Sequence, residues 1–144
     1  MNDCGGCEMI FLKWLARFGI VFVIFLVIDM VWLLFISRKF YAEKLGYLMR
    51  DPINIGAAFL FYVLFVIGVL FFVIHPAMER DSVGYALLAG ALFGLMTYAT
   101  YDLTNLATIK EWPVIITVID LIWGTTLSTL VSFLGYTLIK KIVP

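Results

Sequence analysis

The sequence predicts an all-α integral membrane protein in which four transmembrane helices form an antiparallel bundle. Of its 144 residues, 64% are hydrophobic and only 14% are charged, whereas an ordinary soluble domain has about 25% charged residues. The mean hydropathy is +1.07. Four stretches each contain about 20 mostly apolar residues, the length that crosses a hydrocarbon core of about 30 Å. These observations exclude a water-soluble globular protein.

The four apolar stretches define the expected spans. In chain order they are residues 18–36, 53–74, 83–101 and 114–136. The two tails and three loops that remain are too short to form a separate soluble domain. We therefore expect residues 1–144 to form one membrane domain.

The first span resembles a signal peptide because Lys13 and Arg17 precede an apolar run. However, the run contains Asp29 and lacks a small-residue cleavage site, so we expect the span to be retained. The loop that follows mixes apolar residues with four basic residues. It can lie on the bilayer surface as a short interfacial helix, and the alternative is an ordinary basic loop.

The second and third spans begin at recognisable helix starts. Asp51-Pro52 supplies an acidic N-cap and a proline at the first helical position of the second span, and Asp81-Ser82 can cap the third. The single histidine precedes a proline, as His75-Pro76, where we expect the second span to end.

A stripe of small residues marks one face of the third span. Ala86, Gly90 and Gly94 recur every four residues, and this spacing allows another helix to approach closely. The approaching helix can belong to the same chain or to a second copy.

Three acidic residues lie in or beside the spans. Asp29 and Asp120 are inside them, and Asp102 directly follows the third span. A carboxylate at the bilayer centre costs about 2.5–3.5 kcal/mol on insertion scales, so such acids indicate a function by default. Because successive spans alternate in direction, Asp29 and Asp120 both lie about 10 Å from the same membrane face. Asp102 leaves the third span at that face, so we expect all three acids in one leaflet.

The acids have polar and aromatic neighbours at helical spacing. The pattern D-x-x-W occurs twice, as Asp29 with Trp32 and as Asp120 with Trp123, 91 residues apart. This short match is the basis of a duplication hypothesis. On the third span, three further residues share the face of Asp102 if the helix continues that far: Tyr98, Tyr101 and Asn105.

These eight residues form the predicted ligand or proton site. No lysine, arginine or histidine lies inside the first, third or fourth span to neutralise the acids, and carboxyl groups that lie close together share protons. We expect Asp29 and Asp120 to approach each other, and Asp102 to meet Asn105, a tyrosine or a basic loop residue. In the alternative interpretation each aspartate hydrogen-bonds a neighbouring helix and only holds the bundle together.

The sequence predicts neither a metal site nor a cofactor. Cys4 and Cys7 form C-G-G-C, but there is no second ligand pair, so a structural zinc would need two chains. The single histidine, His75, excludes bis-histidine haem within one protomer. No nucleic-acid partner is expected.

Several motifs resemble a known family. The residues that carry the resemblance are Asp29 and Trp32, Phe40-Tyr41, Leu45-Gly46, Phe61-Tyr62, the run 98–108, Trp112-Pro113, Asp120 and Trp123-Gly124. With these motifs the chain, from about Lys13 onward, resembles the bacterial membrane proteins grouped as domain of unknown function 2177. The resemblance implies a four-span protein of the bacterial cytoplasmic membrane and supplies no established activity. The cysteine-bearing start departs from the family's usual short basic start.

Three function classes remain open. The leading hypothesis is proton- or small-cation-linked solute binding or transport, with homo-oligomers expected because four spans enclose little space. The second is a membrane-embedded lipid-modifying enzyme in which one of the aspartates acts as general acid or base. The third is an accessory or assembly subunit in which the acids are structural.

Loop charges do not decide the orientation in the membrane. Lysine and arginine normally concentrate on the cytoplasmic side, but here five lie on each side of the expected bundle. Such a balance is typical of a dual-topology protein, and the alternative is a single topology fixed by other means.

Overall fold

The computed structural model describes residues 4–49 and 52–143, and its secondary structure is helical. Four helices are long and apolar enough to cross a membrane: Glu8–Phe35, Ile55–Glu79, Val83–Thr108 and Val114–Ile142. The predicted all-α class with four apolar helices is therefore confirmed. Large apolar side chains cover much of the outer surface; Phe35, for example, is 81% exposed, as expected for a surface in contact with lipid tails.

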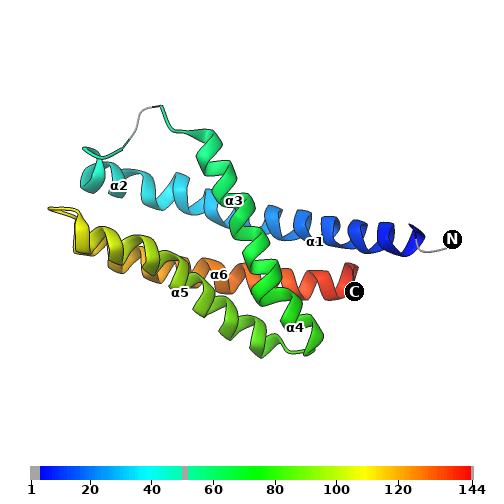
Figure 1. Cartoon of the computed structure of the whole chain (residues 1–144). Coiled ribbons are helices and arrows are strands. Elements are labelled where there is room, and N and C mark those ends of the chain that lie inside the picture. Colours follow the sequence, from blue (N-terminus) through cyan, green and yellow to red (C-terminus); the bar gives the residue numbers. More distant parts are fainter. Residues whose placement is uncertain (1–3, 50–51, 144) are drawn as a thin grey trace.

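The first helical rod is longer than the expected span. It consists of α1 (Cys4–Val31), the π-helix η1 (Trp32–Ser37) and α2 (Arg38–Leu45), which follow one another without a break (Figure 1). The first loop is therefore helical over α2, which continues directly from the first span and does not form a separate helix. Apolar composition indicates where a helix can cross the bilayer, whereas its backbone hydrogen bonds continue into the polar flanks.

The second rod begins and ends later than the sequence predicts. It comprises α3 (Ile55–Val69), the π-helix η2 (Leu70–Ile74) and α4 (His75–Glu79). The Asn54 side chain caps α3 by accepting a hydrogen bond from the Ala57 amide at 3.2 Å. The helix therefore begins at Ile55 and not at Pro52 as expected, and Asp51, the expected cap, lies outside the described residues.

Pro76 does not end this rod, contrary to the sequence prediction. A proline has no amide hydrogen and clashes with the carbonyl four residues earlier. The π-helix η2 comes immediately before α4, and its wider turn relieves the tight i to i−4 register at this point. The helix therefore passes through the proline and reaches Glu79.

The last two helices pack closely together. They are α5 (Val83–Thr108), which Ser82 caps as predicted by accepting from the Tyr85 amide, and α6 (Val114–Ile142). They share the most extensive contact between any two described elements. A Cβ atom added to Gly94 would lie 2.1 Å from the Gly124 carbonyl oxygen. The predicted stripe of small residues therefore faces α6 of the same chain.

The rods surround one apolar core. Figure 1 shows α1 and α6 side by side, with the N-terminal end of α1 and the C-terminal end of α6 at the same end of the molecule, while α3 crosses α1 obliquely. The Arg17 guanidinium donates to the Val143 carbonyl at 3.3 Å and joins those ends. Val21 and Phe25 of α1 meet Val66 of α3 in the core, where all three are fully buried.

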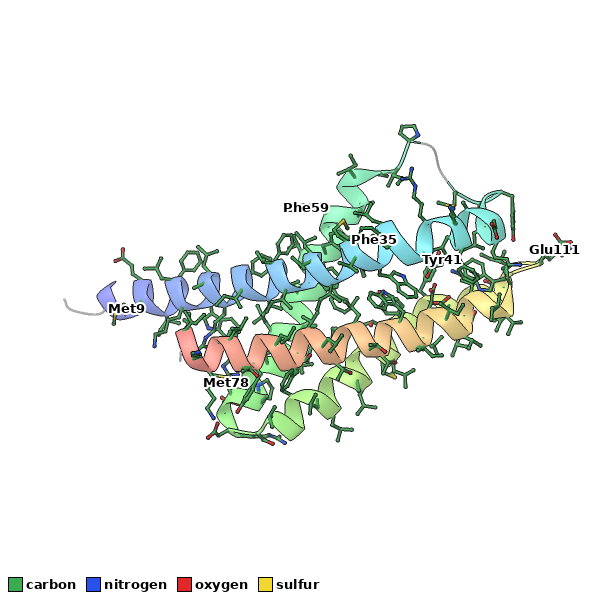
Figure 2. All side chains as sticks on the ribbon, turned by 180° about the vertical axis from the view of Figure 1, so that it is seen from behind. Met9, Phe35, Tyr41, Phe59, Met78 and Glu111 are labelled. Atoms are coloured by element: carbon green, nitrogen blue, oxygen red, sulfur yellow. The ribbon has the colours of Figure 1, made fainter. Side chains whose placement is uncertain are left out.

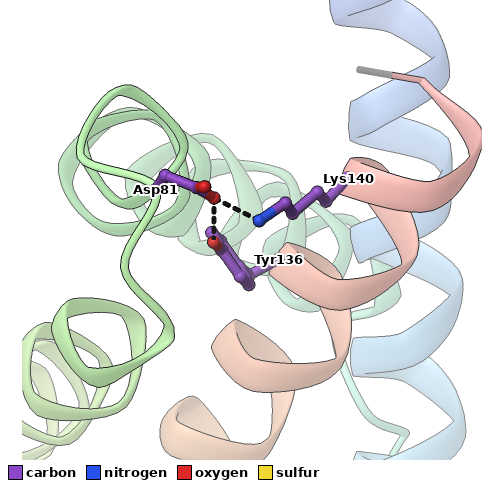
Figure 3. Close-up of polar contacts among 3 residues, drawn as sticks. All are labelled: Asp81, Tyr136 and Lys140. Carbon is purple, nitrogen blue, oxygen red and sulfur yellow. Dashed lines mark hydrogen bonds and ion pairs between the residues drawn. The ribbon is translucent and has the colours of Figure 1, made fainter.

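A polar cluster fixes the turn between α4 and α5 (Figure 3). The Tyr136 hydroxyl donates to Asp81 at 3.0 Å, and Lys140 forms an ion pair with the same carboxylate. The hydrogen bond from Lys140, supported by the one from Tyr136, lowers the pKa of Asp81. This cluster tethers the turn to the last helix at the end of α5 far from Asp102.

Candidate functional site

The three predicted acids are buried and converge from three helices. Asp29 of α1 is 6% exposed, Asp102 of α5 is 0% exposed and Asp120 of α6 is 8% exposed. The half-buried Tyr98 of α5 lies near enough to all three carboxyl groups to interact with them electrostatically. The structure therefore gathers these acids around one tyrosine.

The carboxylate of Asp29 has hydrogen-bond donors from two other helices. The Tyr62 hydroxyl of α3 donates to it at 2.9 Å, and the Trp123 indole of α6 supplies a second side-chain hydrogen bond. Asp29 therefore links α1 to both α3 and α6, which is the role that the bundle-holding interpretation assigns to it.

Asp120 accepts a hydrogen bond from a residue outside the spans. The Tyr41 hydroxyl of α2 donates to its carboxylate, and Figure 2 shows Tyr41 on the side of the rod that faces α6. Burial, together with the Asp120 carboxylate, raises the pKa of Tyr41. The hydroxyl therefore remains protonated and continues to act as a donor.

The π-helix η1 explains why Tyr41 reaches α6. Asp29 and Tyr41 are twelve residues apart, so a continuous α-helix would place Tyr41 about 120° around the axis from Asp29. One residue absorbed in the wider π-helical turn reduces that rotation to about 20°. Tyr41 thus lies on nearly the same side of the rod as Asp29, which contacts α6 through Trp123.

The two tryptophans of the D-x-x-W motifs stack on each other. The ring centroids of Trp32 and Trp123 are 4.2 Å apart and their planes differ by 8°. Trp123 hydrogen-bonds Asp29 of the other motif, and Trp32 hydrogen-bonds Tyr41, which itself donates to Asp120. The hydrogen bonds of Asp29 and Asp120 thus go to aromatic side chains, and this aromatic pair connects the two acids.

Asp102 differs from the other two acids. Neither of its carboxylate oxygens has a hydrogen-bond partner among the described residues, and the charged group that acts on it electrostatically is another carboxylate, Asp120. Among the described residues Asp102 thus makes no hydrogen bond to Asn105, to a tyrosine or to Lys110, although two of the predicted neighbours, Tyr98 and Tyr101, line the same pocket. Arg50, also considered as a partner, lies outside the described residues.

Asp102 and Asp120 line a pocket of about 400 Å³ between α3, α5 and α6. Its lining residues are Phe61, Thr97, Tyr98, Tyr101, Asp102 and Asp120. Phe61 and Tyr101 are 47% and 61% exposed, so their rings form the mouth of the pocket while Asp102 is fully enclosed. By helical rise, Asp102 and Asp120 each lie about 9 Å from the nearer end of their helices.

Some predicted site residues lie elsewhere, and others were missed. Asn105 is not among the residues that line this pocket, although α5 does continue past it. The predicted site did not include Phe61 and Tyr62, because only carboxylates marked a span and the second span has none; it did not include Tyr41 because this residue was assigned to the first loop. The signal that could have found them is their presence in the motifs Phe40-Tyr41 and Phe61-Tyr62.

Metal ligands are not clustered in the described residues. No group of three or more histidine, cysteine, aspartate or glutamate side chains there could hold a metal ion. The side chains of Cys4 and Cys7 lie outside the described part, so the C-G-G-C hypothesis is not addressed by the structure.

Comparison with known proteins establishes the family. The model of the family described as predicted membrane protein DUF2177 matches residues 14–137, so the chain belongs to that family, as the motifs indicated. No curated protein and no solved structure matches the chain. The protein is therefore an integral membrane protein of a family whose description states no activity, and its apolar helices imply a lipid bilayer environment.

Proposed function

We propose that this protein binds a small solute inside the membrane, in the pocket between α3, α5 and α6, and that binding is linked to a proton or a small cation. The observation that carries the proposal is Asp102, a fully buried carboxyl group with both oxygens lacking a hydrogen-bond partner among the described residues. In the proposal, Asp102 and Asp120 hold the positive charge and the aromatic rings contact the solute.

The energetics of burial support this assignment. A buried carboxylate without donors loses its hydration and gains nothing in exchange, and a second carboxylate nearby adds repulsion. A proton or a cation removes both penalties. The arrangement around Asp102 therefore favours a bound positive charge, either as a proton on the carboxyl group or as part of a ligand.

Asp29 differs from Asp102 in its hydrogen bonding, and this difference distinguishes a structural acid from a binding acid in the proposal. Asp29 has donors from Tyr62 and Trp123, so its interactions are complete within the fold. We assign Asp29 to holding the bundle and Asp102 to binding. The proposal places the protein in the bacterial cytoplasmic membrane, where a proton gradient would drive transport if two copies complete the path.

The test is infrared difference spectroscopy of the purified full chain in lipid nanodiscs. We expect a carboxyl C=O band that changes when pH is varied from about 5 to 9 or when Na⁺ replaces choline in the buffer. The Asp102→Asn variant should lose that response, because an amide is neutral, does not titrate and has no carboxyl C=O band. The matched control, Asp29→Asn, should retain it, because its acid lies outside the pocket.

Two outcomes would overturn the proposal. One is a wild-type spectrum without any carboxyl band that responds to pH or Na⁺. The other is a response that Asp102→Asn leaves unchanged while circular dichroism shows that the variant is folded.

A further inference from the structure

From the lining of the pocket we infer the class of solute: a small amphiphilic organic cation that carries N–H donors, such as an alkylammonium or alkylguanidinium ion. This inference rests on the proposed function, since it names the ligand of the same pocket. It follows from three features: the unpartnered oxygens of Asp102, the aromatic rings of the lining and the size and position of the pocket.

The first feature is the hydrogen-bonding deficit at Asp102. Both oxygens of this fully buried carboxyl group lack partners among the described residues. A proton on one oxygen, or a Na⁺ ion, would neutralise the charge, but neither supplies an N–H or O–H group to both oxygens. A primary ammonium supplies three donors and a guanidinium supplies five in a planar fork that matches a carboxylate. A quaternary ammonium supplies none.

The second feature is the aromatic lining. Phe61, Tyr98 and Tyr101 contribute three rings from two helices, and the faces of aromatic rings attract organic cations within about 6 Å. Two of these rings belong to tyrosines, whose faces interact with cations as well as bury alkyl groups. Acidic and aromatic residues together are therefore suited to a cation with an apolar portion, rather than to a hydrated inorganic ion alone.

The third feature is the shape of the site. A volume of about 400 Å³ lies near the small end of the range for ligand pockets, about 300–1,000 Å³. The carboxyl groups lie about 9 Å inside the ends of their helices, while the exposed rings of Phe61 and Tyr101 form the mouth. A short-chain cation can thus place its charged end at Asp102 and its alkyl chain against the rings.

The experiment compares three probes of equal chain length: n-hexylammonium, n-hexyltrimethylammonium and n-hexanol. Binding is measured by isothermal titration calorimetry to the full chain in phosphatidylcholine nanodiscs at pH 7, with empty nanodiscs as the partition background. We expect saturable binding of hexylammonium. Hexyltrimethylammonium should bind about 10- to 100-fold more weakly because it cannot donate to Asp102, and hexanol should show partition only.

Variants connect the binding to the pocket. Asp102→Asn should weaken hexylammonium binding about 10- to 100-fold. Phe61→Leu removes one ring at a partly exposed position that tolerates substitution, and it should weaken binding by several-fold. The matched control, Glu79→Gln, makes the same carboxylate-to-amide change at the last residue of α4, near the N-terminal end of α5 and far from Asp102, and should leave binding unchanged.

The possible failures are distinguishable. If both cations bind equally and Asp102→Asn weakens both, the N–H requirement is wrong and the proposed function stands. If neither cation binds above the partition background while the infrared response of Asp102 is present, the solute class is wrong and the proton- or cation-linked site stands. If Asp102→Asn changes neither measurement, both proposals fall.

Discussion

The close contact between α5 and α6 at Gly94 allows a quantitative test of the packing around the site. Gly94 of α5 faces α6 so closely that an added Cβ would lie 2.1 Å from the Gly124 carbonyl oxygen and 2.6 Å from the Ser128 Cβ. Unbonded heavy atoms normally approach to about 3.5–4.0 Å. The change Gly94→Ala would therefore force α5 and α6 apart by more than about 1 Å.

The expected cost follows from the chemistry of overpacking. Extra methyl groups in well-packed interiors destabilise proteins by about 1–3 kcal/mol, and here the upper part of that range applies because the obstructing atom of Gly124 belongs to the backbone. A rigid helix backbone cannot rotate away as a side chain can. We therefore expect Gly94→Ala to lower the free energy of unfolding by about 2–3 kcal/mol.

The assay is reversible unfolding in mixed detergent micelles, followed by circular dichroism as the denaturing detergent increases. Gly19→Ala is the matched control, because Gly19 also lies within a long helix but an added Cβ meets nothing within 4 Å. The control should unfold like the wild type. If Gly94→Ala is as stable as Gly19→Ala, the close α5–α6 contact does not exist in the membrane protein.

Three further predictions concern the aromatic network and the turn between α4 and α5. Tyr41→Phe removes the donor to the buried carboxylate of α6 and should destabilise by about 1–3 kcal/mol, whereas Tyr47→Phe, at an exposed tyrosine, should change stability little; equal effects would contradict the network. A double-mutant cycle that replaces Trp32 and Trp123 with leucine should give a coupling energy of about 0.5–1.5 kcal/mol, and additive effects would exclude the stack. The pKa of Asp81 is lowered in the folded protein. The stabilisation of the fold by its ionised carboxylate is therefore complete above the ordinary carboxylate pKa of about 3.9 and is lost as pH falls through the lowered value. The melting temperature of Asp81→Asn should lie slightly below that of the wild type at neutral pH and coincide with it in strong acid.

Much of the fold was predictable because the bilayer imposes simple rules. A long apolar run must form a helix when no water is present to satisfy its backbone, so four helices followed directly from composition. The stripe of Ala86, Gly90 and Gly94 also predicted close packing, although only the structure identifies α6 as the partner. The helix boundaries were not predictable from hydropathy, since Asn54 caps one helix by local geometry and Pro76 is accommodated by a π-helix.

The candidate site was predicted only in part, because the sequence argument assumes the regular 3.6-residue period of an α-helix. The depth argument places the acids at one level, but it assumes ideal α-helices. The π-helix Trp32–Ser37 adds one residue to the turn and thereby brings Tyr41 toward Asp120, which no α-helical wheel would show. Tyr62 was missed for a different reason: a hydroxyl donor carries no charge and stands out little among apolar residues.

The D-x-x-W motif occurs at both Asp29 and Asp120 and predicts the same role for both, yet the two acids have different surroundings in the structure. Asp29 has two donors from neighbouring helices, while Asp120 has Tyr41 as a donor and also lines the pocket with Asp102. The acid with the unmet hydrogen-bonding capacity, Asp102, lies outside the repeat. Since unmet capacity in a buried carboxyl group is what a ligand can satisfy, the proposed binding site centres on Asp102, with Asp120 beside it in the pocket. Of the two acids in the motif, Asp29 is the one whose hydrogen bonds join neighbouring helices.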